Sequence, residues 1–240
     1  MVPVLTLVGI SHVFDLSRQV REVILARQPG VVGLELDPAR FAALQQQGRR
    51  GGPPLYFLLS LVQKRIADLY GSNVGGEMIA AAQAAKDVGA RVAFIDRDSL
   101  ELFRAWFRGM TFWERVKVLV SIVAGLFVPK ERVEAELAKY EEDQAGYLEL
   151  FGQALPHTKR AMIDDRNAHM ADVLRSLHAD TARIVAVVGD GHVEGIRGLL
   201  ADLPLEVIRL KDLRSASSPP PPPTGQGQSI TYSFDLRGGS

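Results

Sequence analysis

The segment Ile184-Val185-Ala186-Val187-Val188 runs directly into Gly189-Asp190-Gly191-His192, and this junction decides the fold class. An uninterrupted apolar run rich in β-branched residues is typical of a strand that is buried on both faces of a parallel sheet. Gly189 then allows the chain to turn tightly as it leaves the sheet. The pattern therefore places His192 just outside the carboxyl end of the strand, where open parallel sheets bind their ligands.

Short apolar runs of the same kind recur along the chain, and segments with helical periodicity lie between them. The other predicted strands are Val4–Val8, Val31–Leu36, Arg91–Ile95 and Leu205–Leu210. The predicted helices are Leu16–Arg27, Pro38–Gln47, Pro54–Tyr70, Glu77–Val88 and Val193–Ala201. This alternation predicts an α/β fold with a mainly parallel central sheet flanked by helices.

A long helical stretch interrupts the alternation between the third and fourth predicted strands. We expect a helical insertion over about residues 100–180, made of helices at Leu100–Val128, Glu131–Leu150 and His157–Leu177. An insertion of this kind caps the ligand-binding edge or forms an oligomerisation surface, and the sequence does not separate the two uses. Residues 1–214 are thus predicted to form one α/β domain.

The composition changes abruptly beyond Arg214. Residues 215–229 contain five consecutive prolines and form a predicted proline-rich linker. In residues 230–240, apolar and polar side chains alternate as in a half-buried strand. We expect this tail to cover a sheet edge of its own chain or of a partner; a disordered tail is the alternative.

Charge and composition exclude several functional classes. The 240 residues carry 28 basic and 28 acidic side chains, so no net charge favours nucleic acid or an anionic membrane, and such binding would need a local patch. The absence of cysteine excludes disulfides, thiol nucleophiles and cysteine-held metal clusters. The sequence shows no secretory leader, and Val116–Val128 is too short to span a bilayer. We therefore expect a cytoplasmic protein with no transmembrane span.

The strongest chemical signal is a G-x-x-H motif that occurs twice. Val4–Val8 runs into Gly9-Ile10-Ser11-His12, as the fourth strand runs into His192. Glu35 and Asp96 leave the second and third strands at equivalent points, so all four side chains are predicted at one edge of the sheet. Imidazole and carboxylate could hold Zn, Mn or Co to activate water, or act on water directly as general bases. The alternatives are loop histidines and carboxylates that cap helices or pair with surface arginines.

Two further clusters are secondary candidates. Gly75-Gly76-Glu77-Met78 is expected to open a helix, where backbone amides favour an anion or a structural contact. Asp165 and His169 share a helix face beside Arg166, although a solvated helix face explains that spacing equally well.

Taken in order, these motifs resemble the TraB/PrgY family within the wider Tiki-like superfamily. The resemblance covers about residues 4–210 and rests on Gly9 with His12, Val31–Asp37, Gly75–Met78, Ile95–Asp98, Asp165-Arg166 and Gly189–Ile196. It implies a metal-dependent hydrolase site of His12, Glu35 and His192, with Arg166 and Asp96 in support. The family's usual Glu-Arg-Asp followed by Tyr-Met appears here as Asp165-Arg166-Asn167 followed by His169-Met170. His169 could add a ligand, whereas Asp165 puts activity in doubt if a glutamate is essential.

The preferred hypothesis is a metal-dependent hydrolase, most plausibly a peptidase, in which Arg166 stabilises the developing oxyanion. One alternative is a binding module that sequesters a pheromone-like peptide or haem without chemistry. Others are a metal-independent esterase and a scaffold that keeps only a remnant of an active site. The expected partners are a peptide or small-molecule substrate and a second copy, bound through the helical insertion or the C-terminal strand.

Overall fold

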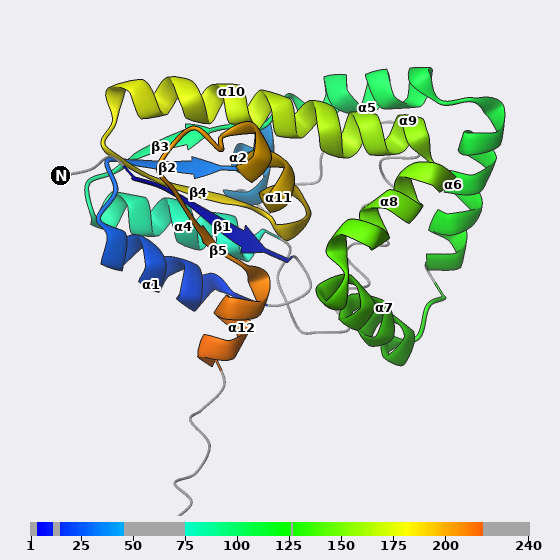
Figure 1. Cartoon of the computed structure of the whole chain (residues 1–240), viewed down its shortest axis with the longest axis horizontal. Coiled ribbons are helices and arrows are strands. Elements are labelled where there is room, and N and C mark those ends of the chain that lie inside the picture. Colours follow the sequence, from blue (N-terminus) through cyan, green and yellow to red (C-terminus); the bar gives the residue numbers. More distant parts are fainter. Residues whose placement is uncertain (1–3, 12–14, 46–74, 126, 218–240) are drawn as a thin grey trace, which may run out of the picture.

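The computed structural model describes residues 4–11, 15–45, 75–125 and 127–217 and confirms the predicted α/β architecture (Figure 1). Five parallel strands form one sheet in the order β3-β2-β4-β1-β5. The strands are β1 (Val4–Ile10), β2 (Val31–Leu34), β3 (Arg91–Phe94), β4 (Arg183–Gly189) and β5 (Leu205–Ile208). All five lie within two residues of the ranges predicted from the apolar runs.

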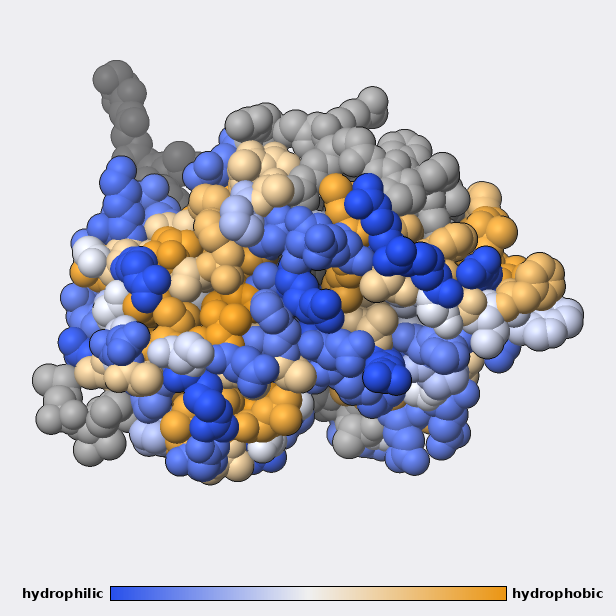
Figure 2. Space-filling model, turned by 90° about the horizontal axis from the view of Figure 1, so that it is seen from above, coloured by the Kyte–Doolittle hydropathy of each residue, from blue (hydrophilic) through white to orange (hydrophobic). Residues whose placement is uncertain are grey.

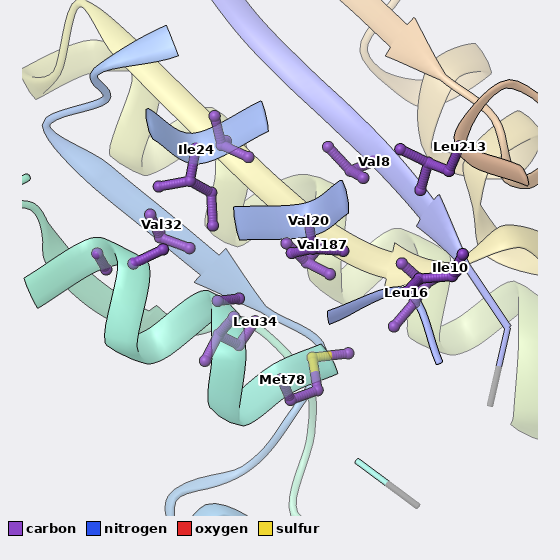
Figure 3. Packing of buried hydrophobic residues seen from close by; sticks show 14 of the residues in the cluster. Val8, Ile10, Leu16, Val20, Ile24, Val32, Leu34, Met78, Val187 and Leu213 are labelled. Carbon is purple, nitrogen blue, oxygen red and sulfur yellow. The ribbon is translucent and has the colours of Figure 1, made fainter. Parts of the chain in front are cut away.

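Helices cover both faces of this sheet, which explains why its strands read as continuous apolar runs. On one face lie α1 (Ser17–Arg27), α4 (Gly76–Asp87) and α12 (Leu210–Ser217), packed over a buried cluster that includes Val20, Met78 and Val187 (Figure 3). On the other face lie α10 (Asp165–Asp180) and α11 (Asp190–Leu199). Side chains along β4 alternate between the two clusters, as the pleat of a strand requires.

The predicted helical insertion is confirmed, and it lies beyond the carboxyl ends of the strands (Figure 1). It contains α5 (Ser99–Gly109), α6 (Phe112–Gly125), α7 (Lys130–Glu142), α8 (Gln144–Ala154) and α9 (Pro156–Lys159). A small core of its own holds α5 to α6 and includes Phe103, Trp106, Val118 and Ile122. The indole N–H of Trp106 donates to Thr158 Oγ1 at 3.0 Å and ties α5 to α9.

The predicted bounds of the insertion helices were wrong in three places. Leu100–Val128 is two helices, because the Glu114 carboxylate accepts the Thr111 N–H at 3.2 Å and starts α6 afresh. Glu131–Leu150 is also two helices, because Asp143 accepts the Gly146 N–H at 2.9 Å and caps α8. In place of one helix at His157–Leu177, α9 passes through a π-helical turn, η1 (Arg160–Asp164), into α10.

Two other predicted segments, the helix Pro54–Tyr70 and the tail at residues 230–240, lie outside the described residues. Helix α12 continues beyond Arg214 to Ser217, into the stretch predicted as linker. The helix α2 (Pro38–Gln45) is the remaining element of the described residues. Within the described ranges, no helix combines the length and the apolar character that a membrane crossing requires.

Candidate functional site

The sheet places three of the four predicted strand-end residues, Glu35, Asp96 and His192, at one edge. Strands β1 and β4 are hydrogen-bonded neighbours, and their register pairs Ile10 with Gly189. His192 lies in the first turn of α11, directly after β4. Glu35 directly follows β2, and Asp96 lies two residues beyond β3. His12 lies outside the described residues.

Arg166, in the first turn of α10, joins the other site residues. Its Nε and Nη2 donate to the two carboxylate oxygens of Asp96 at 3.0 and 2.8 Å. Nη2 also donates to Glu35 Oε1. Nη1 donates to the Met162 carbonyl at 3.3 Å and lies 3.1 Å from His192 Nε2. These contacts engage all five N–H groups of a guanidinium within the site.

Arg166 stays protonated in this environment. Burial lowers its pKa, but the carboxylates of Glu35 and Asp96 outweigh burial and raise the pKa above its usual value. The guanidinium is therefore a permanent cation that holds two buried acids. In this conformation, a role as oxyanion stabiliser would require Arg166 to release one of its present partners.

Glu35 is held on its other side by the backbone. The Gly189 N–H donates to Glu35 Oε2 at 2.5 Å, and a Cβ at position 189 would lie 3.3 Å from that oxygen. Gly189 has a φ of −58° and a ψ of 136°, so no left-handed turn is formed there. Gly189 thus lets the Glu35 carboxylate come close to the start of α11.

The contacts of His192 define its protonation state. Because an arginine N–H can only donate, His192 Nε2 must carry a lone pair, and Nδ1 then donates to Asn167 Oδ1 at 2.7 Å. Burial and the nearby Arg166 lower the pKa of His192, although Glu35 and Asp96 act in the opposite direction. His192 is therefore a neutral imidazole with an accepting nitrogen aimed into the site, 3.4 Å from Glu35 Oε1.

Sequence reasoning noted Asn167 only as a departure from the family pattern and missed its role. The Asn167 side chain is buried, and its hydrogen bond to Nδ1 fixes the orientation and tautomer of the His192 ring. Gly195 makes room for it, because a Cβ there would lie 2.0 Å from Asn167 Nδ2. The spacing of His192 and Gly195 was the only sequence signal for this contact, and it did not identify Asn167 as the partner of His192.

Substitution of Gly195 with alanine is expected to lower the free energy of unfolding by about 1–3 kcal/mol and to displace Asn167 from His192. Urea unfolding and the titration of His192 by NMR would measure the two effects. Gly198→Ala is the matched control in the same helix, because nothing lies within 4 Å of a Cβ at that position. It should raise stability by about 0.4–1 kcal/mol. Equal losses in both variants would contradict the role given to Gly195.

Capping, the alternative interpretation of Glu35 and Asp96, is instead the role of the neighbouring Asp37. Its carboxylate accepts the N–H of Arg40 at 2.7 Å and that of Ser99 at 3.2 Å, so it caps the first turns of α2 and α5. Asp96 also accepts the Arg97 N–H at 2.9 Å and lies 3.5 Å from the Arg40 guanidinium. The two acids therefore fix the loops on which the site is built.

Asp190, in the second G-x-x-H motif, is structural. Its carboxylate accepts two hydrogen bonds from Arg209, at 2.9 and 2.6 Å, and one from the Leu210 N–H at 3.0 Å. A Cβ at Gly9 would lie 2.4 Å from Asp190 Oδ1. The glycine of the first motif therefore admits this carboxylate, which joins the start of α11 to that of α12.

Asp165 and His169 are not among the partners of Arg166. Asp165 Oδ1 lies 3.8 Å from Arg160 Nε, on the π-helical turn. His169 is half-buried on α10. Neither side chain is among the hydrogen-bond or ion-pair partners described for the Arg166 guanidinium.

Glu77 is a different case, because its carboxylate is buried without a partner among the described residues. The residue is 1% exposed, and neither oxygen meets a hydrogen-bond donor there. Burial raises its pKa from 4.5 to about 7, Asp15 adds to the effect, and the amide of Glu77 itself acts against it. As predicted, the motif opens a helix, α4, with Gly75 at a φ of 80°.

A metal ion can be tested against the donors that the structure describes. His192 Nε2 and Glu35 Oε1 are 3.4 Å apart, and two ligands of a tetrahedral zinc ion lie about 3.3 Å apart. However, Arg166 already donates to both atoms. No group of three or more histidine, aspartate or glutamate side chains in the described part of the chain could hold a metal ion. These residues alone do not fit a metal site.

Comparison with known proteins identifies the family of the chain. The model of the TraB/PrgY/gumN family matches residues 3–205, which include Glu35, Asp96, Arg166 and His192. A protein of Methanocaldococcus jannaschii, "Uncharacterized protein MJ1365", is 29% identical over 227 residues. That match covers 85% of this chain and 57% of the archaeal protein, so the chain spans little more than half of its relative. The chain belongs to the TraB/PrgY/gumN family.

Proposed function

We propose that the protein is a hydrolase that activates water at His192 and cleaves an acyl bond, with a peptide as the preferred substrate. The observation that carries the proposal is the neutral imidazole of His192, whose accepting Nε2 faces the site while Asn167 fixes Nδ1. A general base must be unprotonated and held in one orientation before it can accept a proton from water. Burial lowers the pKa of His192 and so favours its neutral form.

The reaction begins with an exchange of partners around His192. Nε2 accepts from Arg166 in this structure, so water must replace that N–H before His192 can take its proton. Arg166 Nη1 keeps the Met162 carbonyl as a partner, and the N–H that it releases can then face the carbonyl oxygen of the bond under attack. Glu35, 3.4 Å from Nε2, stabilises the imidazolium that forms. His192 finally returns the proton to the leaving group.

A divalent metal ion is the second way to activate water at the same atoms. Zn, Mn or Co bound by His12, Glu35 and His192 would lower the pKa of a bound water. The described residues supply two of those donors, and Arg166 contacts both of them. The steps above therefore involve only groups of the chain, and metal analysis decides between the two modes.

Substitution of His192 with alanine should reduce turnover at least 100-fold, because the site loses its only described imidazole. The measurement is cleavage of a library of peptides and esters, followed by mass spectrometry. His157→Ala is the matched control, since that imidazole is half-exposed and faces Glu114 in the insertion. His157→Ala should keep the activity of the unmodified protein.

Three outcomes separate the alternatives. If the purified protein carries stoichiometric Zn, Mn or Co that is absent from a His12→Ala/His192→Ala variant, and chelation stops turnover, the reaction is metal-dependent. If turnover persists without metal, His192 acts directly. If the protein binds peptides or haem, seen as a Soret band, and leaves them unchanged, it is a binding module and the hydrolase proposal fails.

A further inference from the structure

Helix α6 carries an exposed apolar stripe in addition to the face that it buries. Successive residues of an α-helix are about 100° apart, so positions 112, 116, 119, 120, 123 and 127 would share one side. Phe112, Leu119, Val120 and Val123 on that side are exposed, and Phe127 is exposed just past the end of the helix. Trp113 borders the stripe and is 71% exposed. Apolar side chains reach the surface at this end of the molecule (Figure 2).

The buried face of α6 is a separate one. Val118 and Ile122 pack into the small core with Trp106, and Glu114 on the same face is buried. Those positions lie on the side of the helix roughly opposite the stripe. The stripe is therefore not needed for the packing of the insertion, and its apolar area faces solvent at a cost in free energy.

The exposed charged side chains of α6 have one sign. The exposed charged residues of α6 are Arg115 and Lys117, which border the stripe on its two sides. The only acid of the helix, Glu114, is buried and accepts hydrogen bonds from Thr111 and from the His157 N–H. The preceding helix α5 exposes Arg104 and Arg108 together with one acid, Glu101. Arg115 of α6 lies 4.7 Å from the centre of the Phe107 ring on α5. The surface is thus apolar at its centre and basic at its borders.

We infer that α6 docks on the surface of an anionic lipid bilayer and lies in the interface plane. An interfacial helix combines an apolar face with Trp and Phe and basic borders that meet lipid headgroups. A second copy fits less well, because antiparallel pairing of two α6 stripes would bring Arg115 and Lys117 of each helix against the same cations of the other. The apolar centre and basic borders both match an anionic bilayer. This inference stands apart from the proposed hydrolase.

The two tryptophans of the chain provide the measurement. Trp113 is 71% exposed at the border of the stripe, whereas Trp106 is 4% exposed in the core. When the full chain is mixed with vesicles of phosphatidylcholine and phosphatidylglycerol, we expect cosedimentation and a blue shift of the emission. Vesicles of phosphatidylcholine alone should bind at least ten-fold more weakly, and added salt should weaken the anionic binding. Trp113→Phe should remove the blue shift and keep the cosedimentation.

A charge on the stripe tests the surface directly. Val120→Glu should reduce vesicle binding at least ten-fold, whereas Leu199→Glu should not, because Leu199 is an exposed apolar residue on α11. Both positions are exposed, so circular dichroism should show both variants folded. The inference is overturned if Val120→Glu binds vesicles as the unmodified protein does, or if the unmodified protein binds none. Concentration-dependent dimers that Val120→Glu abolishes, without vesicle binding, would assign the stripe to a second copy instead.

Discussion

Replacing Arg166 with methionine is expected to lower the free energy of unfolding by about 3–5 kcal/mol. The change removes the cation shared by Glu35 and Asp96, whose side chains are both buried. The two carboxylates would then remain close together in a medium of low polarity, where an unpaired charge is strongly unfavourable. Urea unfolding followed by circular dichroism measures the loss.

Arg175→Met is the matched control on the same helix. Arg175 also forms two hydrogen bonds to one carboxylate, that of Asp202, but the two side chains are 44% and 61% exposed. An exposed pair contributes little, so this change should cost less than about 1 kcal/mol. In the Arg166→Met background, Asp96→Asn should restore part of the lost stability. Similar losses at positions 166 and 175 would contradict the structural account of the Arg166 network.

Replacing Glu77 with glutamine should stabilise the protein in alkaline solution and change little in acid. Folding raises the pKa of Glu77 from 4.5 to about 7, chiefly through burial, so the folded state holds a proton that the unfolded state releases in this range. The free energy of unfolding therefore falls as the pH rises from about 4.5 to 7. The full effect is about 3 kcal/mol, reached above pH 7. Glutamine removes this pH-dependent loss.

Glu114→Gln is the comparison, because Glu114 is a buried glutamate that has partners. Burial raises its pKa, but the amides of Thr111 and His157 outweigh burial, and the pKa lies below its usual value. Glu114 therefore contributes stability above the pKa of the unfolded state, and this contribution disappears as the pH falls. The measurement is urea unfolding at pH 5 and pH 8. At pH 8 the free energy of unfolding should rise for Glu77→Gln and fall for Glu114→Gln. A gain at position 77 that does not depend on pH would refute the account.

The sheet could be predicted from the sequence because its strands are covered on both faces. Burial on both sides selects continuous apolar runs such as Ile184–Val188, and those runs mark the strands. The breaks in the insertion could not be predicted in this way. They depend on single hydrogen bonds that backbone amides donate to the carboxylates of Asp143 and Glu114, and these bonds leave the helical periodicity unchanged.

The site was predictable only as far as the sheet positions it. Glu35, Asp96 and His192 converge because they follow parallel strands, and the sequence reveals strand ends. The contact between Asn167 and His192 depends on how α10 packs against α11, and the absent Cβ of Gly195 is what allows it. The burial of Glu77 likewise depends on tertiary packing around the start of α4. No local pattern encodes either contact.

The π-helical turn at Arg160–Asp164 lies where the insertion joins α10. A π turn contains one residue more than the α-helical turn that it replaces. Excision of one residue there would rotate the chain before it by about 100° around the axis of α10. The covalent path from α9 to Arg166 passes through this turn, so a single residue sets the direction in which the chain enters α10.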